Sequence, residues 1–183
     1  MNTTIILVII IGAVLLFLWY IYNSLIRAKL RVGEAFSQID VQLKRRTDLI
    51  PNLIETVKGY AKHEKEVFEK VSQLRSELMK AQGPEEKADV NNQLSQTLKS
   101  IFAVAEAYPE LKASDNFKEL QTELSDTENK IAYSRQFYNS TVLDYNTKLQ
   151  VFPNVFFAKI LSFKPAEFFG ATEEDKQPVK VSF

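Results

Sequence analysis

His63, the only histidine, is the first residue to consider for chemistry, because imidazole is a common metal ligand and general base. Di-iron helical bundles use two Glu-x-x-His pairs, which one histidine cannot supply, and Tyr60 stands where His63 would need its glutamate. The His63-Glu64 pair begins a zinc-protease pattern, but Val67 occupies the position of the second histidine. The sequence therefore predicts no metal site, and we expect His63 to lie on the surface.

Other catalytic chemistries also lack their residues. The chain has no cysteine, which excludes thiolate catalysis, disulfides and cysteine-ligated metal clusters. There is no nucleophile-elbow serine and no glycine-rich phosphate loop, although a Ser-Lys dyad stays open. Lysine plus arginine equals aspartate plus glutamate, 23 each, so no net charge favours nucleic acid. We expect a non-enzymatic protein without a cofactor.

Five charged residues fall within or close to apolar stripes, and Arg45 and Arg46 are possible partners for them. Paired across helices, they would form half-buried networks that fix helix register. The alternative is a polar groove that recognises a partner. The residues are Asp40, Arg45, Arg46, Glu55, Glu106, Glu128 and Arg135.

The basic run at residues 44–46 could bind phosphates or lipid headgroups. Along a straight helix it lies about 30 Å beyond Ile26, which disfavours contact with the membrane of the same molecule. We therefore favour a solvated face or ion pairs within the bundle.

Residues 1–26 predict a membrane anchor. Residues 3–26 carry no charge, and residues 5–22 would span about 27 Å as a helix, close to the hydrocarbon thickness. Trp19, Tyr20 and Tyr22 would form an aromatic belt at one end. A cleaved signal peptide needs a basic start and a small-residue cleavage site, and neither is present. A buried core helix is the other alternative, and the length and flanks disfavour it.

Basic residues set the expected orientation. Arg27, Lys29 and Arg31 directly follow the anchor, and residues 44–46 add three more, whereas no basic residue precedes it. The positive-inside rule then places the N-terminus outside and the large domain in the cytoplasm.

Helical spacing of apolar residues predicts the rest of the domain at residues 27–152. The anchor helix should continue to about Asp48, with Pro51 as the first break and the start of a second helix. That helix carries a heptad stripe over residues 53–81 and ends at Gly83–Pro84. A third helix closes at Pro109, and a fourth covers residues 114–151, with Ser114 or Asp115 as its cap.

These stripes predict an all-α fold in which the transmembrane helix continues into an elongated antiparallel four-helix bundle. Each fully buried Leu, Ile or Phe would contribute about 1.5 to 3 kcal/mol. If successive helices alternate in direction, the Gly83–Pro84 link and the end of the fourth helix lie near the membrane. The links at Pro51 and Pro109 would then lie at the far tip.

Residues 153–170 are rich in phenylalanine, and residues 171–183 are polar and predicted to be disordered. The phenylalanine-rich segment could cap the membrane end of the bundle, lie in the headgroup layer or contact another copy. Candidates for membrane-interface contact are Trp19, Tyr20, Tyr22, Phe156, Phe157, Phe163, Phe168 and Phe169.

Several stretches carry a family resemblance. They are residues 34–61 (EAFSQIDVQLKRRTDLIPNLIETVKGYA), residues 103–112 (AVAEAYPELK), a run from Thr127 to Asn146 with Tyr-Asn at 138–139 and 145–146, and the pairs at 152–153 and 168–169. Over about residues 25 to 170 the chain resembles the bacterial LemA family. The resemblance implies a bacterial single-pass protein of the inner membrane with a helical bundle, and no established enzymatic activity.

Two functional hypotheses follow. The first is a non-catalytic membrane-anchored scaffold or adaptor of the bacterial envelope, whose bundle binds a protein partner or further copies of itself. The second is a lipid-contacting protein that remodels or maintains the membrane as a homo-oligomer. A third, an enzyme or a partner of a protease, has the weakest support. Membrane lipid is the expected partner of the N-terminal helix, and the protein partner stays open.

Overall fold

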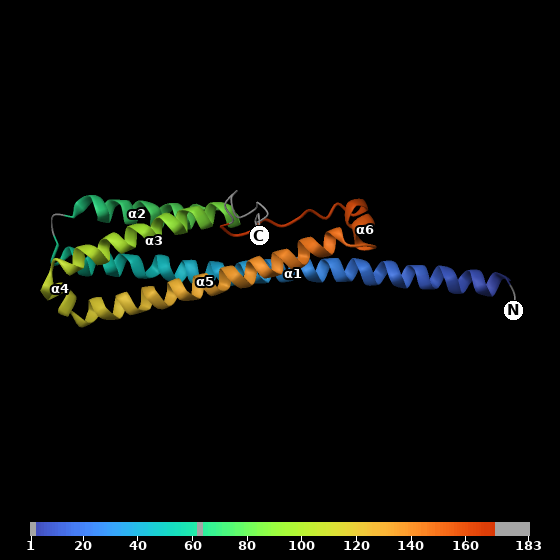
Figure 1. The fold of residues 1–183 in the computed structure, drawn as a ribbon, viewed down its shortest axis with the longest axis horizontal. Helices are drawn as coiled ribbons and strands as arrows, with labels where there is room; N and C mark the ends of the chain where they lie inside the picture. The colour runs from blue at the N-terminus through green and yellow to red at the C-terminus, as the bar shows by residue number, and fades with distance from the viewer. Residues whose placement is uncertain (1–2, 62–63, 171–183) are drawn as a thin grey trace, which may run out of the picture.

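The computed structural model describes residues 3–61 and 64–170, and every regular element in these ranges is a helix. His63 and the predicted disordered tail at residues 171–183 lie outside the described residues. Figure 1 shows an elongated arrangement of these helices. They are α1 (Thr3–Lys58), α2 (Lys65–Lys80), α3 (Pro84–Glu106), α4 (Pro109–Ala113), α5 (Asp115–Gln150) and α6 (Asn154–Ile160).

Helix α1 joins the predicted anchor to the bundle without interruption. It has 56 residues and is about 84 Å long. Its N-terminal part projects beyond the other helices (Figure 1) and is long and apolar enough to cross a membrane. Only 6% of this apolar window is buried, which distinguishes it from a core helix. The predicted continuation of the apolar N-terminal helix beyond residue 26 is confirmed.

The predicted break at Pro51 is wrong, because α1 continues through it to Lys58. Proline has no N–H, so the carbonyl of Thr47, one turn earlier, lacks its intrahelical donor. Arg75 of α2 supplies the missing hydrogen bond: its Nε donates to the Thr47 carbonyl oxygen at 2.7 Å. The second helix therefore begins at Lys65, and the early positions of the predicted heptad stripe belong to α1.

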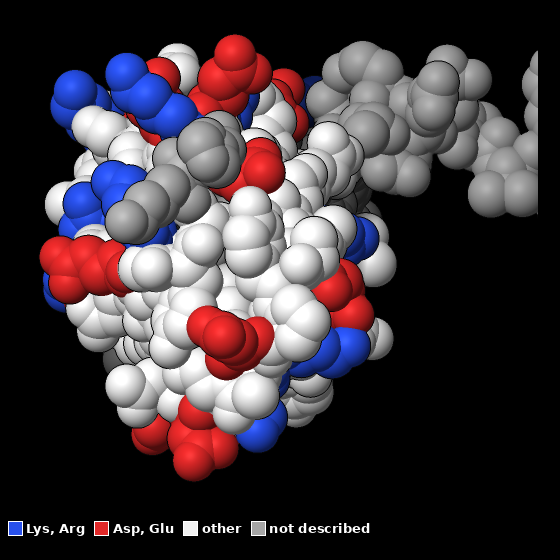
Figure 2. Space-filling model, turned by 90° about the vertical axis from the view of Figure 1, so that its left-hand side faces the viewer, with Lys and Arg blue, Asp and Glu red and all other residues white. Residues whose placement is uncertain are grey.

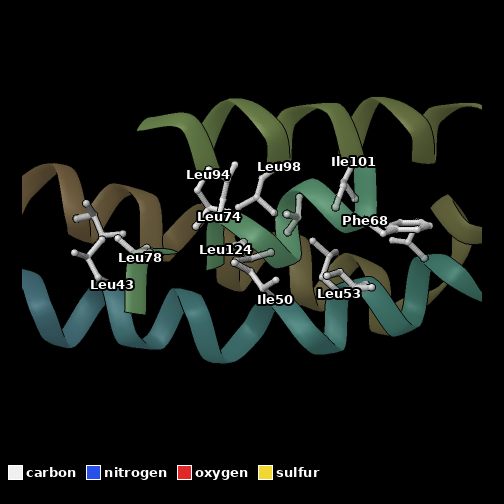
Figure 3. Close-up of a cluster of buried hydrophobic side chains, with 14 of the residues drawn as sticks. Leu43, Ile50, Leu53, Phe68, Leu74, Leu78, Leu94, Leu98, Ile101 and Leu124 are labelled. Carbon is white, nitrogen blue, oxygen red and sulfur yellow. The ribbon is translucent and has the colours of Figure 1, made fainter. Parts of the chain in front are cut away.

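The main core lies where α1, α2, α3 and α5 come together (Figure 3). Helix α1 packs most extensively against α5, and α2 packs against α3. Ile50 and Leu53 of α1 face Phe68 and Leu74 of α2, with side chains from α3 and α5 completing the cluster. The side chains from α3 and α5 belong to the apolar stripes predicted for those helices. Phe68 of α2, in contrast, lies outside the heptad stripe predicted for residues 53–81.

The link at Gly83–Pro84 does not reach the membrane end, contrary to the prediction. Helix α2 has 16 residues and is only about 24 Å long, less than half the length of α5. Just after the link, Lys87 pairs with Asp40 of α1 and lies over the Phe36 ring, 5.1 Å from its centroid. Asp40 is about 27 Å beyond Tyr22 along α1. The α2–α3 hairpin therefore covers only the half of the bundle far from the anchor.

Residues 163–170, here called the C-terminal strap, cover the remaining half. Helix α6 ends at Ile160, and Ser162, two residues later, lies in the left-handed region (φ 56°). The Phe163 N–H donates to the Ala158 carbonyl at 2.9 Å. This Schellman-type end reverses the chain. The strap then runs back along the bundle to Gly170, which adjoins Ala88 near the start of α3 (Figure 1).

Two Tyr-Asn pairs on α5 hold the strap. Asn146 exchanges two hydrogen bonds with the backbone of Ala166 (2.9 and 2.8 Å), and Asn139 does the same with Phe169 (3.2 and 2.8 Å). The hydroxyls of Tyr138 and Tyr145 donate to carbonyls of the strap, at 2.8 and 3.0 Å. Seven residues of helix advance about 10.5 Å, and three extended residues advance about 10 Å. The seven-residue repeat on α5 therefore matches a three-residue repeat on the strap.

The strap corrects part of the predicted membrane contact. Phe169 is only 1% exposed and belongs to the main core, against which Phe168 also packs. Phe157 and Phe163 pack on a second, smaller cluster between α1, α5 and α6. Phe163, Phe168 and Phe169 of the strap and Phe157 of α6 thus pack on the bundle, whereas Phe156 is exposed.

Candidate functional site

A buried arginine lies at the centre of the candidate site. Arg46 of α1 is 3% exposed. Its Nη1 donates to Asn91 Oδ1 of α3 and forms an ion pair with Glu128 Oε2 of α5, each at 2.7 Å. Ser95 of α3 donates to the same carboxylate at 3.1 Å. Three helices thus contribute to one polar cluster inside an apolar bundle.

Burial and charge act in opposite directions on this guanidinium. Burial lowers the pKa of Arg46, while the carboxylate of Glu128 partly offsets that effect. The Glu128 side chain is 46% exposed, so the ion pair extends from the interior toward solvent. One turn earlier on α1, Gln42 Oε1 is buried without a hydrogen-bond partner among the described residues, as is Arg46 Nε. The polar cluster therefore keeps unused hydrogen-bonding capacity.

A groove between α3 and α5 lies over this cluster. It has a volume of about 740 Å³, with Arg46 and Glu128 among its lining residues. Leu98, Phe102 and Leu124 give it an apolar floor, and its rim is polar, with Lys99, Gln121, Thr122, Ser125, Asp126 and Asn129. An apolar floor with a polar rim is typical of surfaces that bind an amphipathic helix.

Arg45 lies beside this site. It pairs with Glu123 and, at 3.7 Å, with Asp126, both on α5. Lys130 donates a hydrogen bond to Asp126 and lowers the pKa of that carboxyl group. Two residues of the basic run, Arg45 and Arg46, thus make ion pairs within the bundle, which is one of the two interpretations that we favoured from the sequence.

The other predicted site residues are spread along the rod. Asp40 pairs with Lys87, and the exposed Glu106 pairs with Lys112 near α4. Glu55 is exposed on α1, and Arg135 is exposed on α5 beside Gly170. Of the seven candidates, the structure brings together only Arg46 and Glu128, with Arg45 on the neighbouring surface.

Sequence reasoning missed Asn91, Ser95 and Arg75. Asn91 did leave a signal, because it precedes Leu94 by three residues and so occupies an apolar-stripe position of α3, where it is 4% exposed. A polar residue in such a stripe indicates a partner in the interior. The role of Arg75 had no local signal, since it depends on a carbonyl freed by a distant proline.

The end of the rod far from the anchor carries mixed charge. Figure 2 views this end, where acidic and basic side chains are interspersed with uncharged residues. Within residues 3–61 and 64–170, no group of three or more His, Cys, Asp or Glu side chains could hold a metal ion. Among the described residues, the α3–α5 groove over Arg46 is the candidate functional site.

The predicted membrane-interface residues divide into two groups. Trp19, Tyr20 and Tyr22 are exposed on α1, and Phe156 is 59% exposed on α6. Phe157 contacts Phe17 of the apolar segment, with ring centroids 6.4 Å apart, whereas Phe163 turns toward the bundle.

Comparison with known proteins identifies the family. A family model described as the LemA family matches residues 35–183. The chain belongs to the LemA family. Protein LemA of Metamycoplasma hominis is 27% identical over 161 residues, which cover 87% of this chain and 74% of that protein.

Two further relatives of this LemA-family chain are magnetosome proteins by name. MamQ 2 of Paramagnetospirillum magneticum is 25% identical and MamQ of Magnetospirillum gryphiswaldense is 24% identical. Each alignment spans 189 residues, covering 86% of this chain and 68% of the relative.

The stretches that carried the family resemblance now have structural roles in this LemA-family chain. Residues 34–58 of the first stretch form the part of α1 that holds Arg46 and Pro51, and the two Tyr-Asn pairs hold the strap. The family and the apolar segment of α1 together support a membrane location.

Proposed function

We propose that this protein is a non-catalytic, membrane-anchored scaffold or adaptor of the bacterial envelope. It binds a protein partner through an amphipathic helix of that partner, seated in the α3–α5 groove. The anchor crosses the inner membrane once, with the bundle in the cytoplasm.

The observation that carries this proposal is the continuity of α1. One helix holds both the apolar segment and Arg46, which lies beneath the groove about 36 Å beyond Tyr22. A continuous helix packed along α5 keeps the groove at a fixed height above the membrane. Such an arrangement suits a protein that positions a partner.

Photo-crosslinking in the native membrane tests the proposal. A photoreactive amino acid is placed at Lys99 or Thr122, both exposed on the rim of the groove. The control position is Ser76, exposed on α2 outside the groove. We expect a discrete protein adduct from both rim positions and none from Ser76.

Two outcomes contradict the proposal. Adducts of equal yield at Ser76 and at the rim would show nonspecific proximity. No protein adduct from either rim position would show that the groove is not a docking surface.

The second candidate function is self-association that acts on the membrane. Tyr133 and Phe137, one turn apart on α5, are 74% and 48% exposed, and such aromatic pairs are common in interfaces. Electron microscopy of vesicles carrying the full chain tests this function. Tyr133→Ser should disperse assemblies seen with the unmodified chain, and vesicles of unchanged shape without assemblies would exclude it.

A further inference from the structure

Helix α6 has two apolar faces with different surroundings. On one face, Ala158 packs with Ile21 and Leu25 of α1, which are 3% and 0% exposed. On the other side lies an outer row made of Phe156 and Ile160 of α6 and of Phe152 in the turn just before the helix. Phe152, Phe156 and Ile160 are 80%, 59% and 77% exposed. The spacing of four residues puts Phe156 and Ile160 on one side of the helix, and the Phe152 and Phe156 rings are in edge contact at 6.0 Å.

The height of α6 along α1 places the outer row at a membrane boundary. Phe157 of α6 contacts Phe17, and Ala158 covers Ile21. As a helix, residues 5–22 are about 27 Å long, enough to span the hydrocarbon layer. Helix α6 therefore lies against the last turns of this apolar segment. Figure 1 shows α6 at the end of the bundle from which the apolar part of α1 projects.

The chemistry of the row suits the headgroup layer. With about 200 Å² for each large side chain, the row exposes roughly 400 Å² of apolar surface, as much as the largest patch on a typical monomer. Trp19, Tyr20 and Tyr22 are exposed at a similar height on α1, and aromatic rings favour this layer. Lys159 is also exposed on α6, where it can approach lipid phosphates.

We propose that the outer row of α6 lies in the lipid headgroup layer of the bilayer that holds α1. The inference rests on the membrane anchorage in the proposed function. A second lipid contact beside the anchor restricts the tilt of the rod. Since α6 is joined to α5 on one side and to the strap on the other, this restriction extends to the bundle.

Spin-label accessibility measures the depth of the row. The chain has no cysteine, so single labels at Leu15→Cys, Val41→Cys and Ile160→Cys report lipid, water and the outer row. Leu15 and Val41 are 61% and 64% exposed, which makes them matched references. The full chain is placed in phosphatidylcholine nanodiscs, and collision with oxygen, which concentrates in lipid, is compared with collision with a water-soluble nickel complex.

We expect the oxygen-to-nickel ratio at position 160 to be severalfold higher than at 41 and below that at 15. Phe156→Ser should lower the ratio at 160, whereas Met79→Ser, on an exposed residue of α2 far from the anchor, should leave it unchanged. Equal ratios at 160 and 41 with a lipid value at 15 would overturn the inference while leaving anchorage intact. Low access to both reagents at 160 would indicate a covering second copy and would also overturn it. A water value at 15 would refute the anchorage itself.

Discussion

At the scale of single residues, Arg75 and Asn91 each complete a polar group that would otherwise lack a partner. Arg75 donates to the carbonyl that Pro51 leaves free, and Asn91 accepts from the buried guanidinium of Arg46. Leaving a buried polar group unpaired costs about 1–3 kcal/mol, so replacing Arg75 or Asn91 with a residue that cannot make the contact should destabilise the fold. Two predictions follow from particular side chains.

The first prediction concerns the proline in α1. Arg75→Met keeps the aliphatic stem but removes the donor to Thr47, which is 3% exposed, and should lower the free energy of unfolding by about 1 kcal/mol. Pro51→Ala restores an N–H at position 51, so Arg75→Met should cost less than half as much in that background. Denaturant unfolding of the detergent-solubilised chain, followed by circular dichroism, measures both costs.

Lys70→Met, on an exposed residue of α2, is the matched control and should have little effect. The same cost for Arg75→Met in both backgrounds would show that Arg75 does not act through the proline.

The second prediction concerns alkaline pH. Burial, together with the nearby Glu167, raises the pKa of Tyr138 to about 12. The neutral hydroxyl donates to the Glu167 carbonyl, and an ionised oxygen could not. In the unfolded chain tyrosine ionises near pH 10, so unfolding releases a proton between about pH 10 and 12 and stability falls with rising pH there.

Tyr138→Phe should therefore make the loss of stability between about pH 10 and 12 shallower than in the unmodified chain. Unfolding curves over this range, with tyrosinate absorbance as a second signal, test it. An unchanged slope would contradict the assignment.

At the scale of elements, the strap takes the place of a longer hairpin. Helix α5 is about 54 Å long and α3 about 35 Å, so some 20 Å of the α1–α5 pair would otherwise be left without α3. Extended chain has few internal hydrogen bonds, and the side chains of Asn139 and Asn146 supply them instead. The strap thus depends on α5 for its conformation.

The third prediction follows from this dependence. Each asparagine makes two hydrogen bonds with the strap, worth about 1 kcal/mol each, so Asn146→Ala should speed exchange of the Ala166 amide roughly 30-fold. Asn139→Ala should do the same at Phe169. Hydrogen exchange measured by mass spectrometry resolves these amides from those of α2 and α3, which should keep their protection.

Asn129→Ala, on an exposed residue of the same helix, is the control and should leave the strap unchanged. Faster exchange throughout the bundle in Asn146→Ala would show general destabilisation instead of release of the strap.

At the scale of the whole molecule, one long helix fixes the relation between membrane and bundle. Helix α1 contributes to the apolar segment, the second cluster, the Arg46 site and the main core. Because α1 continues unbroken through Pro51, the half of the bundle far from the membrane is rigidly joined to the half near it.

The fourth prediction measures this rigidity. Spin labels at Leu30→Cys and Glu55→Cys, both exposed and on either side of Pro51, should be about 37 Å apart along an unbroken helix, before the label arms are added. Pulsed electron resonance in nanodiscs should give one narrow distance distribution, unchanged by Pro51→Ala. A broad, shorter distribution that Pro51→Ala sharpens would instead indicate a hinge at the proline.

The sequence by itself determined the features that depend on local periodicity. The uncharged stretch of residues 3–26, the stripes of α3 and α5 and the stop at Gly83–Pro84 follow from apolar spacing and from breaker residues. The residue signature likewise indicated the family. These features require only neighbours along the chain, so one sequence is enough to predict them.

Only the tertiary structure decided the features that depend on partners distant in sequence. Pro51 by itself predicts a break in the helix, but Arg75, 24 positions later, supplies the lost hydrogen bond and the helix continues. Phe169 was a candidate for membrane contact from the sequence, but Asn139 holds the strap against the bundle and Phe169 is buried. Arg46 finds Glu128 because α1 and α5 pack side by side. Local pattern sets which helices can form, and long-range contacts decide where each one ends and which polar groups meet.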